Sequence, residues 1–255
     1  MTSNSAKSDY YDHLCKFIIQ MTELEILYQD EQIIAINKPN GLLVHRTSLA
    51  RDADEFALQI LRDQIGKQVT PAHRLDRKTS GVLIFTLSAE SNTQMQKQFA
   101  ENKIKKVYLA IVRGFTDDSG MIDYPLVKEN GTSQSATTNY HTLSRSELEI
   151  PFGKQQTSRY SMVEITPQTG RMHQIRKHFA HILHPIIGDR PHGCNKQNKL
   201  FKDNWNMTTM LLHASEIRFF HPASNLEITI NASLNDEFNR TANFLKLNTG
   251  QGETI

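Results

Sequence analysis

The chain has 255 residues, 38% of them hydrophobic, and a formal net charge of +2 at pH 7. It is long enough for one large domain or two small ones, no apolar run reaches the length of a membrane span, and the N-terminus lacks the pattern of a secretory signal. Because two cysteines form neither a disulfide framework nor a metal knuckle, we expect a soluble protein of the reducing cytoplasm.

The first folded element is expected to be a β-hairpin. Residues 1–21 are polar and lack a hydrophobic period, so we expect a disordered N-terminal extension there. Residues 24–28 and 33–36 alternate like two strands around an acidic turn. We expect one domain over residues 22–248, followed by a flexible tail at 249–255.

Helical spacing of apolar residues recurs twice in the next part of the chain. Residues 54–65 have a loosely helical pattern that Gly66 can end. Ser88 can cap a second helix from Ala89 to about Asn102. Residues 107–112 then alternate like a strand, with Val107, Leu109 and Ile111 on one face and Tyr108, Ala110 and Val112 on the other.

The second half of the chain contains more strands and a third helix. Residues 115–151 predict short strands and turns, and residues 160–166 a further strand. A helix is expected to begin near His173, with an apolar stripe of Ile175, Phe179, Ile182 and Leu183 and with Arg176, Lys177, His181 and His184 turned away from the core. Strands follow at about 217–220 and 226–230. Many short strands with three modest helices predict an α+β fold with a mixed or largely antiparallel sheet.

One carboxylate stands out because of its neighbours. Asp76 lies in a loop with His73, Arg74, Arg77 and Lys78, just before the apolar run 82–87 that predicts a buried strand. Nearby positive charge favours the ionised carboxylate, which suits a nucleophile or an electrostatic anchor. An ordinary surface ion-pair network is the alternative interpretation of the same pattern.

A longer resemblance decides between these interpretations. The segment His73-Arg74-Leu75-Asp76-Arg77-x-Thr79-Ser80-Gly81 resembles the catalytic motif of the RluA-type pseudouridine synthases. Other motifs of that family follow in the same order along the chain. They are Asn37-Lys38-Pro39-x-Gly41, Lys106-x-Tyr108-x-Ala110, Thr169-Gly170-Arg171-x-His173-Gln174-Ile175-Arg176, His184-Pro185-Ile186-Ile187-Gly188-Asp189 and Leu211-Leu212-His213-Ala214.

The resemblance implies a fold and a reaction. The fold is the pseudouridine synthase fold, a mixed, mostly antiparallel sheet in two halves with a central active-site cleft. The reaction is isomerisation of a flipped-out uridine in RNA without a cofactor. By resemblance Asp76 is the nucleophile, Arg176 pairs with it, and Tyr108 stacks on the base.

Further residues receive roles in binding RNA. By resemblance Arg74 fills the gap left by the flipped base and Leu212 lines the uracil pocket; a plain core leucine is the alternative for Leu212. Arg171 either contacts a phosphate or holds the fold. The predicted RNA-binding residues are Arg77, Lys78, Lys105, Lys106, Arg171 and Lys177.

Segments outside the shared motifs indicate which of the family's RNA substrates to expect. Residues 24–31, 61–66 and 123–127 most resemble members that act on uridine 65 of tRNA, so tRNA is the expected partner of a monomeric enzyme. A uridine of ribosomal RNA is the alternative, because RNA shape is not spelled out by a residue pattern.

A metal site is the rival chemical interpretation. His178, His181 and His184 are spaced by three residues, as in a metal-dependent hydrolase that binds its ion from one helix. No Cys, Asp or Glu lies among them, and steps of three drift around a helix, so we expect no metal there. A catalytically inactive RNA-binding module is a second rival, against which the intact Asp76 motif argues.

Overall fold

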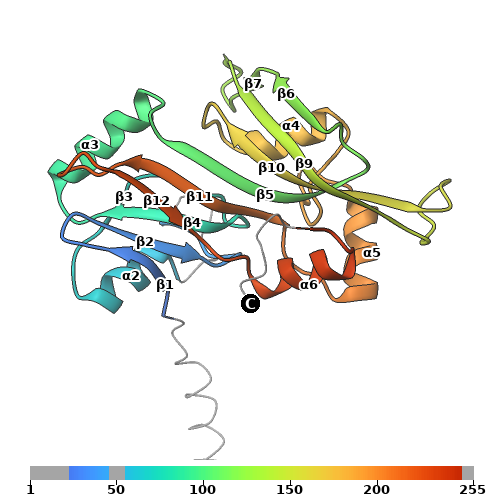
Figure 1. Ribbon diagram of the computed structural model, residues 1–255, viewed down its shortest axis with the longest axis horizontal. Helices are drawn as coiled ribbons and strands as arrows, with labels where there is room; N and C mark the ends of the chain where they lie inside the picture. The colour runs from blue at the N-terminus through green and yellow to red at the C-terminus, as the bar shows by residue number, and fades with distance from the viewer. Residues whose placement is uncertain (1–22, 46–54, 249–255) are drawn as a thin grey trace, which may run out of the picture.

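A computed structural model describes residues 23–45 and 55–248, and the expected extension at 1–21 and tail at 249–255 lie outside this range. The fold is built on one large mixed sheet (Figure 1). Its strands are β1 (Glu25–Gln29), β2 (Ile33–Lys38), β3 (Thr70–Pro71), β4 (Ser80–Thr86), β5 (Lys105–Arg113), β6 (Ser119–Asp123), β9 (Thr137–Leu148), β10 (Ser158–Pro167), β11 (Leu212–Phe220) and β12 (Glu227–Asn231). A separate ribbon pairs β7 (Leu126–Val127) with β8 (Ser133–Gln134).

The two halves of the sheet meet at its centre. The strand order is β1-β2-β4-β11-β5-β10-β9-β6, with β12 beside β11 and β3 beside β4. All pairs are antiparallel except β4 with β11, which are parallel. There Gly81 has a φ of 107°, and a Cβ on it would lie 2.1 Å from the carbonyl oxygen of Ala214. Only glycine therefore lets the two central strands approach this closely.

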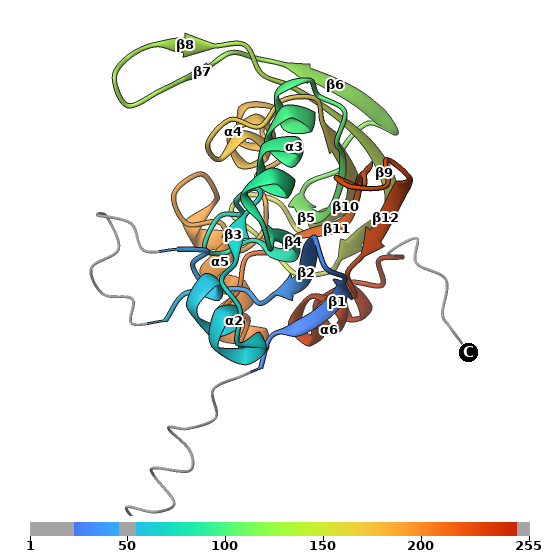
Figure 2. The ribbon, with the colours of Figure 1, turned by 90° about the vertical axis from the view of Figure 1, so that its left-hand side faces the viewer.

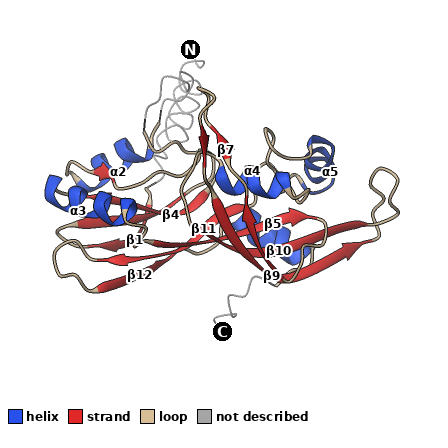
Figure 3. Ribbon diagram, turned by 90° about the horizontal axis from the view of Figure 1, so that it is seen from above, coloured by secondary structure: helices blue, strands red, loops and turns tan. Residues whose placement is uncertain are grey.

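Five described helices pack against the halves of the sheet. They are α2 (Ala57–Ile65), α3 (Ala89–Ala100), α4 (Gln174–His181), α5 (Asn195–Trp205) and α6 (Asp236–Phe244). The side chains of β4 alternate, so Leu83 and Phe85 pack with α2 while Val82 and Ile84 pack with α3. In β5, Leu109 joins the cluster of α5 and α6, whereas Ala110 joins that of α4. Figure 3 shows how α3 and α4 lie over different halves of the sheet.

Most of the predicted elements are present. The hairpin is β1–β2, the capped helix is α3 with Ser88 accepting from the backbone N–H of Ser91, and β5 alternates as expected. The α+β class and the mixed, mostly antiparallel sheet are confirmed. In the part of the chain that the structure describes, no helix is long and apolar enough to cross a bilayer.

Two expectations about α4 were wrong. The helix ends at His181, so Leu183 lies beyond it with a φ of 64° and 81% exposure instead of joining the apolar stripe. Arg176 is only 5% exposed and does not turn away from the core. The reason is that a buried carboxylate on the following loop receives its guanidinium, so a charged residue occupies an inward position.

The predicted number of helices and the middle of the chain also need correction. Helices α5 and α6 were not predicted, because each has few apolar residues and a mostly polar sequence. The region expected to hold short strands contains the 12-residue β9, which pairs with β10 on one side and β6 on the other. Pairing on both edges stabilises a long strand despite its polar composition. Figure 2 shows the β7–β8 ribbon projecting beside α4.

Candidate active site

A buried lysine holds the loop that carries Asp76. Lys38 is fully buried, and its ammonium donates to the carbonyl oxygens of Pro39 at 2.8 Å, Leu42 at 2.9 Å and Arg77 at 3.3 Å. Burial lowers the pKa of Lys38 to about 7, and the negative charge of Asp76 opposes this shift. Three carbonyl acceptors for three N–H donors further favour the ammonium form. Lys38 therefore joins the 38–42 turn to the Asp76 loop.

A second support comes from the same turn and from the loop itself. The backbone N–H of Gly41 donates to the Arg77 carbonyl at 2.8 Å, and the Arg77 Nε donates back to the Gly41 carbonyl at 3.0 Å. The side-chain amide of Asn40 donates to the Lys78 carbonyl. Within the loop, the N–H of Thr79 donates to the Asp76 carbonyl at 3.0 Å. The backbone around Asp76 is thus fixed before β4 begins.

The carboxylate of Asp76 belongs to a three-membered ionic cluster. Arg176 donates from Nη1 to Asp76 Oδ2 at 3.0 Å, and through Nε and Nη2 to both oxygens of Asp189 at 2.7 and 2.8 Å. The side chains of Asp76, Arg176 and Asp189 are 20%, 6% and 1% exposed. Burial alone would lower the pKa of Arg176, but the hydrogen bonds and charges of the two carboxylates raise it overall. A permanent cation therefore orients Asp76.

Asp189 is the member of this cluster to which the sequence assigned no role. Its carbonyl accepts from the Asn198 side chain at 2.6 Å, and its Oδ1 accepts from the backbone N–H of His192 at 3.3 Å. The signal was present, since Asp189 ends an acid-free stretch that contains Arg176 and closes a family motif. Its bidentate bond to Arg176 leaves one guanidinium nitrogen directed at Asp76.

Asp76 opens onto a cleft of about 430 Å³ at the centre of the sheet. Tyr108 reaches it from β5, Leu212 from the start of β11, and Arg74 from the Asp76 loop. Burial raises the pKa of Tyr108, so its phenol stays protonated at neutral pH. Leu212 is 3% exposed and packs with the α4 cluster, so it serves both as a core leucine and as part of the cleft wall. Asp76, Arg176, Tyr108, Arg74, Leu212, Lys106 and Arg171 all line this cleft.

The remaining predicted RNA-binding residues lie outside the cleft lining. Arg77 and Lys105 are exposed, and Lys78 and Lys177 are half-buried. Burial, and then the charges of Arg190 and Arg77, lower the pKa of Lys78. Arg171 lines the cleft and also donates from Nε to the Ser135 carbonyl at 3.1 Å, which ties the cleft wall to the segment after β8.

The histidine beside Asp76 in the sequence is not one of its cations. His73 Nε2 accepts from the backbone N–H of Ile84 at 3.1 Å. Burial, with a smaller contribution from the charge of Lys106, lowers the pKa of His73 to about 3. The expected group of positive charges around Asp76 therefore lacks His73, and Arg176, 100 residues away in sequence, contacts the carboxylate directly.

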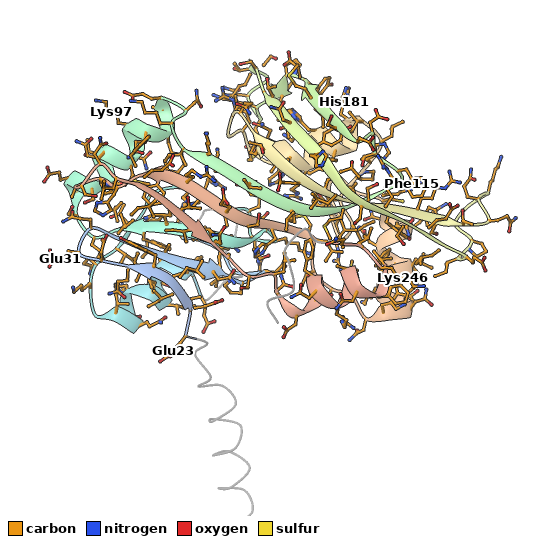
Figure 4. The ribbon with its side chains drawn as sticks, viewed as in Figure 1. Glu23, Glu31, Lys97, Phe115, His181 and Lys246 are labelled. Carbon is orange, nitrogen blue, oxygen red and sulfur yellow. The ribbon has the colours of Figure 1, made fainter. Side chains whose placement is uncertain are left out.

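The three histidines of the metal interpretation have separate partners. His178 Nε2 donates to the Tyr124 carbonyl at 3.0 Å, the His181 ring stacks on Tyr124 at 3.6 Å, and His184 Nδ1 donates to the Arg113 carbonyl at 2.8 Å. Figure 4 shows His181 at the outer edge of its half of the molecule. Over residues 23–45 and 55–248, no group of three or more His, Cys, Asp or Glu side chains could hold a metal ion.

One other histidine adjoins Asp76 and a second contacts that histidine, and neither was singled out from the sequence. His173, directly before α4, has its Nε2 3.8 Å from Asp76 Oδ2. Its Nδ1 lies 2.9 Å from Nε2 of His192. His173 stands inside one of the quoted motifs, three residues before Arg176, but its place beside Asp76 depends on contacts between distant loops.

Comparison with known proteins assigns the family. Residues 32–181 match the family described as RNA pseudouridylate synthase. A protein of Vibrio parahaemolyticus named tRNA pseudouridine synthase C is 48% identical over 225 residues, which cover 84% of this chain and 92% of that protein. The chain belongs to the RNA pseudouridylate synthase family. The resemblance to the RluA-type pseudouridine synthases drawn from the sequence motifs is confirmed.

Other relatives and solved structures agree with this assignment. A Haemophilus ducreyi protein, also named tRNA pseudouridine synthase C, is 44% identical over 85% of this chain and 93% of its own length. The structure of human RNA Pseudouridylate Synthase Domain Containing 4 superposes with a TM-score of 0.68 at 24% identity, over 94% of this chain and 98% of that chain. This likeness shows that the α+β fold is the one that pseudouridylate synthases use.

Proposed function

We propose that this protein is a tRNA pseudouridine synthase that converts the uridine at position 65 into pseudouridine. The observation that carries the proposal is Asp76 held 3.0 Å from a buried Arg176 at the wall of a cleft that also contains Tyr108. Relatives named tRNA pseudouridine synthase C, 42–48% identical over most of the chain, support tRNA as the substrate.

In this proposal each residue of the cleft has its own role in the reaction. Asp76 is the nucleophile that assists cleavage of the N1–C1′ bond, and Arg176 keeps it ionised and oriented. Tyr108 stacks on the extruded uracil, a contact worth about 1–3 kcal/mol, and Leu212 closes the pocket around the base. Arg74, which is exposed at the cleft, takes the place that the base leaves in the RNA. We propose that no cofactor is required, because the reaction has no redox step and needs no input of energy.

The surrounding cations bind the RNA backbone. Lys106 and Arg171 line the cleft, while Arg77, Lys78, Lys105 and Lys177 extend the positive charge around it. We propose a single catalytic domain over residues 22–248, with residues 1–21 as an extension and 249–255 as a tail. We further propose that the protein acts in the cytoplasm as a monomer, with tRNA as its partner.

The substrate is tested by mapping pseudouridines in total RNA from cells with and without this protein, using carbodiimide modification. Loss of one site, at position 65 of tRNA, that is restored by the wild-type gene and not by Asp76→Asn is the expected result. A lost site in 23S ribosomal RNA with tRNA unchanged would replace tRNA by ribosomal RNA and retain the chemistry. No lost site in either RNA would contradict the proposed function.

A further inference from the structure

The proposed isomerisation requires a proton acceptor as well as a nucleophile. The N1–C1′ bond of uridine breaks and a C5–C1′ bond forms, after which C5 must lose its hydrogen as a proton. N1 of the product carries a proton, so the reaction consumes none overall. A base must therefore lie where it can reach the uracil ring while Asp76 serves the sugar or the ring.

Few side chains of the described cleft lining can accept this proton. The arginines are cations, Tyr108 is a protonated phenol, and burial lowers the pKa of Lys106. His73 has its Nε2 lone pair engaged by the backbone N–H of Ile84. His173, Lys106 and Asp76 remain, and Asp76 already has the role of nucleophile. Of the other two, His173 is the one whose ring nitrogen lies within 4 Å of the Asp76 carboxylate.

The backbone places the His173 side chain at the cleft at a conformational cost. His173 has a φ of 56°, in the left-handed region that non-glycine residues seldom adopt. The adjacent turn is held by Gln174, whose Oε1 accepts from Thr169 Oγ1 at 2.7 Å and from the Arg171 N–H at 3.0 Å. This arrangement sets His173 Nε2 3.8 Å from Asp76 Oδ2, and both side chains line the cleft.

A second imidazole connects His173 to the outside of the cleft. His173 Nδ1 lies 2.9 Å from Nε2 of His192, which is half-buried. When His173 donates from Nδ1 to His192, its Nε2 lone pair is free to face the substrate. A proton taken by Nε2 makes His173 a cation beside Asp76, and the Nδ1 proton can then move to His192.

The charges around His173 act in both directions. Burial lowers its pKa, the charge of Asp76 raises it, and Arg176, His192 and Lys177 lower it. Burial also lowers the pKa of His192. Both imidazoles are therefore neutral at neutral pH, which is the state that a proton acceptor needs.

We propose that His173 is the base that removes the C5 proton, and that His192 passes this proton toward solvent. The assignment rests on the proposed function. It adds a catalytic residue and a proton path to a site whose nucleophile and base-stacking ring were already identified by resemblance.

The test compares single-turnover rates on tRNA containing ordinary uridine or uridine deuterated at C5. In His173→Gln the rate should fall about 10²-fold, and a primary deuterium isotope effect larger than that of the wild type should appear because C5–H cleavage becomes limiting. His141→Gln, on the exposed face of β9, should behave like the wild type. His173→Asn is read in the same way should the first variant fail to fold.

Two results would overturn the assignment, and a third would overturn the function on which it rests. An unchanged rate in His173→Gln would show that no proton passes through this residue. A slower rate without the isotope effect, or with the wild-type dependence on pH, would leave His173 as a positioning residue for Asp76. Failure of the wild-type protein to form any pseudouridine would instead overturn the proposed function itself.

Discussion

Two groups of charged residues lie at the cleft: the ionic cluster around Asp76, and the exposed cations at its edge, here called the rim. They differ in how far their charges are buried. Asp76, Arg176 and Asp189 are largely buried and hold one another at 2.7–3.0 Å. Arg74, Arg77 and Lys105 are exposed to solvent. Charges in a buried cluster interact strongly and keep a fixed geometry, whereas exposed charges are screened by salt. The cluster therefore suits chemistry on one nucleotide, and the rim suits attraction of an RNA backbone.

The largest effect should come from opening the cluster. Arg176→Ala leaves two carboxylates without their shared cation, so we expect the free energy of unfolding to fall by about 3–5 kcal/mol and pseudouridine formation to be lost. Arg62→Ala is a matched control, because Arg62 pairs with Asp63 on the surface and its loss should leave the stability close to that of the wild type. Urea denaturation measures both; equal losses would show that the cluster contributes no more than a surface pair.

A second effect concerns the seam between the halves of the sheet. His213 is fully buried, its Nδ1 accepts from Ser80 Oγ at 2.9 Å, and its Nε2 donates to the Ala232 carbonyl at 3.2 Å. Burial lowers the pKa of His213 from 6.5 to about 4. Between these values the unfolded chain binds a proton that the folded chain does not. Stability from this group is therefore complete above pH 6.5 and is lost as the pH falls toward 4.

The His213 prediction is a difference between two titrations. Between pH 6.5 and pH 4 the wild type should lose about 3 kcal/mol more stability than His213→Gln, whose amide does not titrate. Denaturant unfolding at several pH values measures this difference. Parallel curves for the two proteins would mean that His213 does not control the acid stability of the seam.

The smallest effect belongs to the rim. Lys105→Gln should weaken tRNA binding less than about tenfold and reduce the slope of log affinity against log salt by about 1, because one phosphate contact is lost. Lys154→Gln, at an exposed position in the turn between β9 and β10, is the control and should leave the slope unchanged. If both variants have the same slope as the wild type, Lys105 does not contact the RNA.

The contrast between cluster and rim also explains what the sequence could predict. The hairpin β1–β2, helix α3 and the alternation of β5 follow from local periodicity, and these predictions were correct. Motif resemblance brought Asp76, Tyr108 and Leu212 to one cleft. The exposed rim residues were proposed to bind RNA mainly because they are positively charged.

The missed features depend on contacts between distant segments. The pairing of Arg176 with Asp76 was predicted by resemblance, but its burial and its bidentate bond to Asp189, on the loop after α4, were not, because helical periodicity places Arg176 away from the core. His173 lies near Asp76 because its backbone adopts a left-handed conformation, which the residue type does not predict. Helix α5 was missed because its polar sequence hides the buried Phe201 that anchors it. Such placements are decided by tertiary packing, which overrides local preference.

The measurement that tests the account most directly compares Asp76→Asn with Lys105→Gln at saturating tRNA and low salt. Single-turnover release of tritium from tRNA labelled at C5 of uridine reports the chemical step without the contribution of affinity. We predict that Asp76→Asn binds tRNA like the wild type and loses on the order of 10⁴-fold or more in rate, while Lys105→Gln retains nearly the full rate. Substantial turnover by a folded, tRNA-bound Asp76→Asn protein would contradict the central claim that this carboxylate performs the chemistry.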